Sequence, residues 1–285
     1  MTRTDIGSWQ AMARSALAPT SENPGLETVL LLAHVLHRPK EWLLAHPEAV
    51  LTPEQQEQLS TLLARLANGE PLPYITGRQE FFGLSFIVSP DVLIPRPETE
   101  LLMERAINWL RAHPNSTHVA DIGTGSGCIA VSLAASLPGI RVDAVDRSFA
   151  ALRIAGQNAA EHHVSRRVRL VQADLLSAFH GPYDLICANL PYIPYSTLAG
   201  LPVARHEPLQ ALDGGEDGLV FIRRLLEDIR RVTRPGSLIL LEIENRQAAS
   251  VTALVEHVFP HAIVQVHPDL AGHDRLVEAE IQVEP

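Results

Sequence analysis

The segment Asp121-Ile-Gly-Thr-Gly-Ser-Gly127 decides the fold class, because it joins a strand pattern to a helical one. Residues 119–122 have the apolar composition of a buried strand, and residues 128–137 that of a helix. Glycines let a backbone pass close to a ligand, and a helix N-terminus offers free N–H groups. The segment therefore predicts a strand, a ligand-binding loop and a helix, the opening unit of an α/β fold.

Strand and helix patterns alternate after this loop. Short apolar runs predict strands at 141–146, 168–173, 183–188 and 237–243. Helical spacing predicts a helix that ends near 161 and others at 218–232 and 247–258. This alternation is typical of a parallel, doubly wound sheet. The last predicted strands, 262–266 and 275–281, have no helix between them, so we expect one of them to run antiparallel.

The N-terminal part of the chain has a different pattern. Apolar residues recur there at helical spacing, with a helix start at Thr52-Pro53-Glu54 and a stop at Asn68-Gly69. Residues 80–88 are typical of a short hairpin. We therefore divide the chain into a helical N-terminal domain (1–75), a linker with a β-hairpin (76–93) and a larger α/β domain (94–285).

Composition excludes several classes of protein. The net charge of −10 disfavours non-specific binding to nucleic acid, which needs Lys and Arg to neutralise phosphates. Two cysteines, Cys128 and Cys187, are too few for a disulfide framework and are expected to be reduced and buried. No histidine has a partner at ligand spacing, so we propose no metal. The absence of an apolar leader and of an apolar run of about 18 residues predicts a cytoplasmic protein without a membrane span.

The spacing of the glycine loop leaves two cofactors open. The dinucleotide fingerprint is G-x-G-x-x-G. Counted from Gly123 its third glycine falls on Cys128, and counted from Gly125 it falls on Ala130, a permitted variant. Asp146 ends the next strand, where a carboxylate can accept hydrogen bonds from the ribose hydroxyls of a nicotinamide dinucleotide or of S-adenosylmethionine. The alternative role for Asp146 is to cap the following helix.

The tetrapeptide Asn189-Leu-Pro-Tyr192 follows a predicted strand directly, so we expect it at the carboxyl edge of the sheet, beside the glycine loop. A simple turn is the alternative. Asn189 interrupts an apolar run, Pro191 stiffens the loop and Tyr192 supplies a flat face. An amide nitrogen is a poor nucleophile, because its lone pair is delocalised. An asparagine oxygen and a backbone carbonyl could accept its two hydrogens and aim it at a methyl group.

This tetrapeptide resembles the Asn-Pro-Pro-Tyr motif of amino methyltransferases, which adenine-N6 DNA methyltransferases share. Further segments narrow the resemblance: Pro71-Leu-Pro-Tyr-Ile-Thr-Gly77, Leu93-Ile-Pro-Arg-Pro-Glu-Thr-Glu100, Asp121 to Ala130, Glu207-Pro-Leu-Gln-Ala-Leu-Asp-Gly-Gly215 and Leu240-Leu-Glu-Ile243. Together they resemble the HemK/PrmC family of release factor glutamine methyltransferases, nearly end to end. The resemblance implies a Rossmann-like class I fold with a seven-stranded mixed sheet, and a helical N-terminal domain that selects the substrate.

That family transfers a methyl group from S-adenosylmethionine, leaving S-adenosylhomocysteine, to the glutamine of the Gly-Gly-Gln loop in class 1 peptide chain release factors. The resemblance implies that the methionine end of the cofactor is held by Gly123, Thr124, Gly125, Ser126 and Gly127. It places the ribose at Asp146 and the adenine near Asp174 and Leu175. Asn189, which also borders the cofactor, and the carbonyl of Leu190 would accept the target amide hydrogens, with Pro191 and Tyr192 completing the catalytic tetrapeptide.

One position departs from the family pattern, which usually has proline where this chain has Leu190. Leucine keeps the backbone carbonyl, and Pro191 after it favours extended geometry. The φ constraint is lost, so we predict a working site with less preorganisation.

Other charged residues in these motifs have two possible roles. Arg96 and Glu98 either begin a helix or, by the resemblance, cover the cofactor pocket. We expect Asp121 to anchor the glycine loop and Glu242 to be held by local hydrogen bonds.

Three alternative functions remain beside the protein glutamine methyltransferase. An adenine-N6 nucleic-acid methyltransferase needs a basic, aromatic-lined channel, which the acidic composition opposes. A catalytically weak S-adenosylmethionine-binding protein would be marked by Leu190, but Asn189, Pro191 and Tyr192 are intact. For a nicotinamide oxidoreductase no hydride-transfer site is evident. We therefore predict an enzyme that acts on class 1 release factors as a monomer, without direct contact to nucleic acid.

Overall fold

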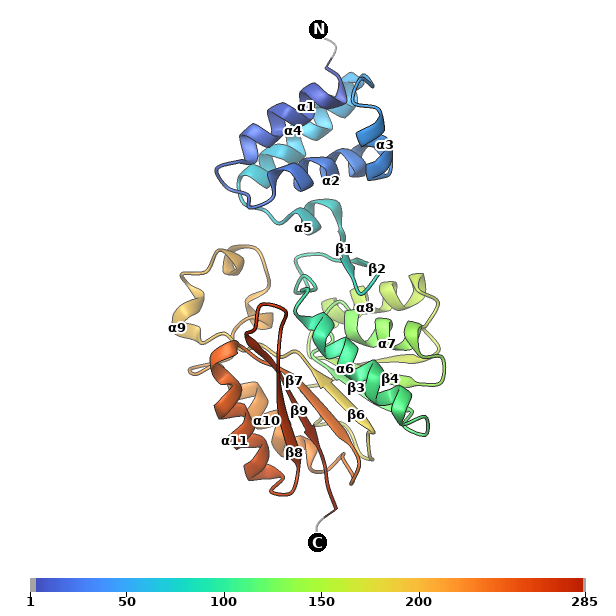
Figure 1. Ribbon diagram of the computed structural model, residues 1–285, viewed down its shortest axis with the longest axis vertical. Helices are drawn as coiled ribbons and strands as arrows, with labels where there is room; N and C mark the ends of the chain where they lie inside the picture. The colour runs from blue at the N-terminus through green and yellow to red at the C-terminus, as the bar shows by residue number, and fades with distance from the viewer. Residues whose placement is uncertain (1–3, 284–285) are drawn as a thin grey trace. The chain divides into compact units, whose positions relative to one another are not determined.

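Figure 1 shows a computed structural model of the chain, which describes residues 4–283. The chain divides into two compact units, with the boundary between Arg78 and Gln79. Within the described residues, no helix combines the length and apolar character needed to cross a membrane.

The first unit consists of helices: α1 (Ile6–Leu17), α2 (Pro24–Leu36), α3 (Lys40–Ala45), α4 (Pro53–Ala67) and α5 (Leu72–Thr76). The predicted start of α4 is confirmed, since Thr52 Oγ1 accepts from the N–H of Gln55 at 3.2 Å and the Gln55 side chain accepts from the N–H of Thr52. Trp9, Leu31 and Leu59 are among the side chains of a separate apolar core. The helical spacing in the sequence thus reflects a bundle that buries its own apolar faces.

The second unit is built on a seven-stranded sheet with the order β5-β4-β3-β6-β7-β9-β8. Its strands are β3 (His118–Ile122), β4 (Arg141–Asp146), β5 (Val168–Gln172), β6 (Leu185–Ala188), β7 (Leu238–Glu242), β8 (Ile263–Pro268) and β9 (Asp274–Glu280). Strand β9 pairs antiparallel with both β7 and β8, and the other pairs are parallel. This confirms the doubly wound mixed sheet with one antiparallel strand.

Helices cover both faces of this sheet (Figure 1). Helices α6 (Thr99–Ala112), α7 (Cys128–Ser136) and α8 (Phe149–Glu161) lie on one face, and α10 (Val220–Ile229) and α11 (Ala248–Val258) on the other. Along β7, side chains alternate between two apolar cores. Leu238 and Leu240 belong to the core that includes residues of α6 and α7, whereas Ile239 and Leu241 belong to the core that includes residues of α10 and α11. A strand buried on both faces reads as a continuous apolar run, which explains the pattern in the sequence.

Shorter elements complete the second unit. The predicted hairpin is formed by β1 (Arg78–Phe81) and β2 (Leu84–Ile87). Between β6 and α10 lie α9 (Tyr195–Leu198) and the 3₁₀ turns η1 (Pro202–Arg205) and η2 (Leu209–Ala211), and η3 (Asn245–Gln247) precedes α11. Cys128 and Cys187 are free thiols. Cys187 is buried as expected, but Cys128 is only partly buried because it begins α7 beside the glycine loop.

Candidate active site

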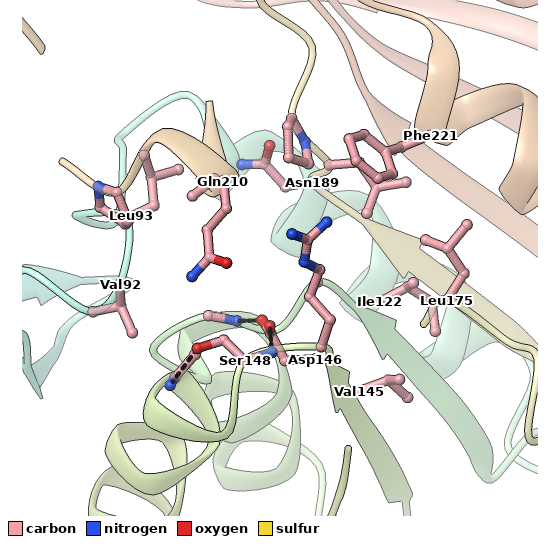
Figure 2. A pocket seen from close by; sticks show the side chains of 18 of the residues that line it. Val92, Leu93, Ile122, Val145, Asp146, Ser148, Leu175, Asn189, Gln210 and Phe221 are labelled. Carbon is pink, nitrogen blue, oxygen red and sulfur yellow. Dashed lines mark hydrogen bonds between the residues drawn. The ribbon is translucent and has the colours of Figure 1, made fainter. Parts of the chain in front are cut away.

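A pocket opens at the carboxyl ends of the central strands, where open α/β sheets bind their ligands. It holds about 740 Å³ of empty space, including its open mouth. Figure 2 shows Ile122, Val145, Leu175 and Phe221 on one side of the pocket and Val92 and Leu93 on the other. Apolar walls with a few polar groups suit a nucleoside-sized ligand.

The glycine loop after β3 forms part of the wall. Gly123, Gly125 and Gly127 have φ values of 75°, 55° and 80°, in the left-handed region that other residues avoid. A Cβ atom on Gly127 would lie 3.0 Å from the Cβ of Ala155, and one on Gly123 would lie 3.1 Å from the Leu190 side chain. Glycine is therefore required for both conformation and packing in this loop.

The carboxylate of Asp121 anchors the same loop. Its Oδ2 accepts from the Thr124 hydroxyl at 2.6 Å and from the main-chain N–H of Ala130 at 3.1 Å. Burial raises the pKa of Asp121 to about 7. These contacts confirm the anchoring role that we expected for Asp121.

Asn158 on α8 also holds the loop. Its Nδ2 donates to the carbonyl of Ser126 at 2.8 Å and to that of Ile87 at 3.0 Å, and its Oδ1 accepts from the N–H of Ile87 at 2.7 Å. The side chain is completely buried. Asn158 was not among the predicted site residues, because its signal in the sequence is only that of a polar residue on the apolar face of a helix.

Asp146 connects the end of β4 to the glycine loop. Its Oδ2 accepts from the N–H of Gly125 at 2.9 Å and its Oδ1 from the N–H of Ser148 at 2.8 Å (Figure 2). Burial raises the pKa of Asp146. Helix α8 is capped instead by the Ser148 hydroxyl, which accepts from the N–H of Ala151. Capping therefore does not explain Asp146, which lines the pocket and whose carboxylate oxygens keep lone pairs for further donors.

The residues after β5 and on α10 line the apolar part of the pocket. Leu175 has a φ of 52°, and Phe221 is a further lining residue. Asp174 also lines the pocket, while its carboxylate pairs with Arg224 at 2.5 Å and about half of its side chain is exposed. Phe221 was not among the predicted site residues, because an aromatic residue near the start of an amphipathic helix is typical of the core.

The tetrapeptide lies where its position after β6 predicted. Asn189, Leu190 and Pro191 line the pocket, and Tyr192 does not. Asn189 Nδ2 donates to Thr99 Oγ1 at 3.1 Å, which leaves Oδ1 as the acceptor of this carboxamide. Burial raises the pKa of Tyr192 to about 12, so its phenol stays neutral at physiological pH.

The backbone of the tetrapeptide is held from behind by two glycines and a glutamine. A Cβ on Gly218 would lie 2.2 Å from the carbonyl oxygen of Tyr192, and one on Gly214 would lie 2.8 Å from that of Pro191. Gln247 Nε2 donates to the carbonyl of Tyr192 at 3.0 Å. The Glu207 to Gly215 motif therefore includes a glycine that allows the close approach.

A buried carboxylate ties together two segments that border the pocket. Glu207 accepts from the N–H of Ile94 at 3.1 Å and forms an ion pair with Arg96. Residues 91–93, just before this contact, and residues from 208–211, just after it, line the pocket. Arg96 and Glu98 do not line the pocket. Arg96 acts instead by fixing the segments that do.

Comparisons with known proteins show what this chain is similar to. Residues 8–77 match the PrmC N-terminal domain, and residues 98–197 match the methyltransferase small domain. The release factor glutamine methyltransferase of Moorella thermoacetica is 44% identical over 256 residues, which are 89% of this chain and 90% of that protein. That of Coxiella burnetii is 37% identical over 264 residues, 92% of this chain and 94% of that protein.

The chain belongs to the release factor glutamine methyltransferase family. The family inferred from its motifs is thus confirmed. Solved structures share the fold: a methyltransferase from Pyrococcus furiosus has a TM-score of 0.53 at 18% identity and covers 79% of this chain and 100% of its own. The N-terminal domain of human METTL16, in complex with SAH, has a TM-score of 0.50 at 19% identity and covers 71% of this chain and 77% of its own.

This methyltransferase family uses S-adenosylmethionine, and the residues of the pocket fit that cofactor. Gly123 and Gly125 present bare backbone, Asp146 presents carboxylate oxygens, and Leu175 and Phe221 present apolar surface. Thr124, Ser126 and Gly127 do not line the pocket, and their contacts to the cofactor stay a prediction. Two of them have buried side chains that shape the loop.

Proposed function

We propose that this protein transfers the methyl group of S-adenosylmethionine to the side-chain amide nitrogen of the glutamine in the Gly-Gly-Gln loop of class 1 peptide chain release factors. The supporting observation is the orientation of Asn189. Its Nδ2 is bonded to Thr99 at 3.1 Å, so that its Oδ1 is left to accept a hydrogen from a target amide at the edge of the pocket. The names of the curated relatives point to the same substrate.

The chain contributes by positioning the target. Asn189 Oδ1 and the carbonyl oxygen of Leu190 accept the two amide hydrogens and turn the nitrogen toward the methyl donor. Pro191 restricts this loop, and the ring of Tyr192 packs nearby. When bound, the cofactor supplies an electrophilic methyl group on a sulfonium. No charged base is needed before transfer, because the nitrogen loses its proton after the new bond has formed. Catalysis is then mainly orientation and proximity.

For the cofactor, we assign the methionine end to the loop Gly123–Gly127 and the ribose to Asp146. Leu175 and Phe221 supply the apolar contacts for the adenine, with Asp174 at its edge. The acidic composition, with a net charge of −10, favours a protein substrate over a nucleic acid. We further propose that the enzyme acts in the cytoplasm, as a monomer.

The test is transfer of labelled methyl from S-adenosylmethionine to a purified class 1 release factor. A factor with Gln→Ala in its Gly-Gly-Gln loop is the control substrate, and Asn189→Ala is the control enzyme. We expect label only where the natural enzyme is combined with the natural factor. Equal label on the Gln→Ala factor would contradict the proposed target. No label on either factor, with cofactor binding intact, would contradict the proposed reaction.

A further inference from the structure

Three motifs that are far apart in the sequence come together around the side chain of Asn189. Thr99 is the first residue of α6, Glu242 is the last residue of β7, and Asn189 directly follows β6. Thr99 and Glu242 have exposed fractions of only 2% and 3%. Neither lines the pocket. They form a buried polar group whose members contact the catalytic tetrapeptide from the side away from the ligand.

The numbers of donors and acceptors in this group fix the direction of its hydrogen bonds, from Asn189 to Thr99 and from Thr99 to Glu242. The Thr99 hydroxyl accepts from Asn189 Nδ2 at 3.1 Å, so its own single hydrogen is available to an acceptor. Hydrogen bonding from Thr99 and from Asn189 stabilises the carboxylate of Glu242 and opposes the effect of burial on its pKa. Among residues 4–283, the Oε2 atom of Glu242 has no hydrogen-bond partner, so this carboxylate has acceptor capacity to spare.

A flipped carboxamide would be disfavoured in this setting. It would turn Asn189 Oδ1 toward the Glu242 carboxylate, which in its ionised form only accepts hydrogen bonds, and Thr99 Oγ1 would lose its donor. Buried polar groups without partners are costly, so the flipped state would carry an electrostatic penalty. The observed state directs the two amide hydrogens inward and leaves Oδ1 for the target.

We propose, resting on the function proposed above, that Thr99 and Glu242 are positioning residues that lock the Asn189 carboxamide with its oxygen toward the substrate. This lock selects a substrate group that donates hydrogen bonds. A glutamine amide has two such hydrogens, and a glutamate carboxylate has none. The buried pair therefore contributes to the choice of an amide target.

A matched pair of variants tests the lock. Thr99→Val keeps the shape of the side chain and removes the hydroxyl, whereas Thr99→Ser keeps the hydroxyl. We expect Thr99→Val to lower kcat roughly 10- to 100-fold, since small misplacements of an orienting group cost that much. We expect its dissociation constant for the cofactor to stay within about twofold of the natural value, because Thr99 does not line the pocket. Thr99→Ser should restore most of kcat.

The assay of the natural enzyme tests the proposed function separately from the lock. If the natural enzyme is active, a Thr99→Val enzyme with unchanged kcat would overturn the lock alone. Equal losses in the valine and serine variants, or a parallel loss of cofactor binding, would overturn it too. If Thr99→Val does not fold, a second pair of variants tests the lock. Glu242→Gln keeps one acceptor oxygen, and Glu242→Leu keeps none. We expect kcat to fall from the natural enzyme to glutamine to leucine, and an unchanged kcat for Glu242→Leu would refute the lock.

Discussion

Asn158 Nδ2 donates to the carbonyl oxygen of Ser126 at 2.8 Å, and so joins helix α8 to the glycine loop. The same carboxamide makes two hydrogen bonds to the main chain of Ile87 in the hairpin. One buried side chain therefore fixes two segments that are far apart in the sequence. The glycine loop is therefore held in part by residues, such as Asn158, that do not themselves line the pocket.

We expect Asn158→Ala to destabilise the protein by about 2–4 kcal/mol, because it leaves one buried and two partly buried main-chain groups without this partner. It should also weaken cofactor binding, since the loop loses its support. Gln157→Ala, an exposed position on the same helix, is the matched control. Urea unfolding and calorimetric titration with cofactor measure the two effects. Equal stability of the two variants would contradict this role for Asn158.

The contact of Glu207 with Arg96 and Ile94 predicts an effect on cofactor exchange. Because the contact holds two segments that line the pocket, Glu207→Gln should speed cofactor dissociation several-fold, while unfolding stability falls by roughly 1–3 kcal/mol. Stopped-flow displacement of bound cofactor measures the rate. Asp228→Asn, which removes an ion pair with Arg231 that does not line the pocket, is the control. Identical dissociation rates for the Glu207→Gln and Asp228→Asn variants would contradict the role of Glu207 in holding these two segments.

Leu190 is the departure from the family pattern, and its side chain is buried against the glycine loop. Leu190→Pro should give a kcat at least equal to that of the natural enzyme, because proline restricts φ at 190 and also restricts Asn189 before it. Steady-state kinetics at saturating release factor and cofactor measure this. Leu190→Ala, which removes the same packing without the constraint, should be slower. A proline variant slower than the natural enzyme would show that leucine packing matters more than preorganisation.

Local patterns were sufficient to predict most of the fold. The glycine loop, the strand and helix alternation and the final antiparallel strand all follow from periodicity and from turn residues, which act over short distances. Asp146 and Asn189 could be placed because Asp146 ends a strand and Asn189 directly follows one, and the ends of parallel strands meet at one edge. Their position required no knowledge of side-chain contacts.

Long-range contacts could not be predicted in this way. The bonds of Asn158 to Ser126, of Glu207 to Ile94 and of Thr99 to Asn189 each join residues from different elements. A single sequence shows a polar residue in an apolar stretch but not its partner. Glu242 was expected to be held by local hydrogen bonds, yet its partners come from α6 and from the loop after β6.

Two buried carboxyls predict opposite effects of pH on stability and on activity. Burial raises the pKa of Asp121 and that of Glu242 to about 7, from their ordinary values of 3.8 and 4.5. The folded state then binds protons more tightly than the unfolded state. These groups therefore destabilise the fold when ionised, and the free energy of unfolding should rise as pH falls from about 8 toward about 5. The pKa of Asp184 is lowered, so its protonation affects the free energy of unfolding only below this pH range.

Activity should move the other way in the same range. Protonation of Glu242 removes the anionic acceptor for Thr99 and Asn189, so kcat should fall as pH drops below about 7. The charges that act on Glu242 are those of Arg275, which favours the ionised form, and of Glu98, which disfavours it. Glu242→Gln should flatten the kcat profile and reduce the slope of the stability profile, in which the contribution of Asp121 remains. Glu244→Gln, at a partly exposed neighbour, should leave both profiles unchanged. Thermal unfolding and kcat, measured across the same buffers, provide the test. A stability that falls together with kcat on acidification would contradict the assignment of these buried carboxyls.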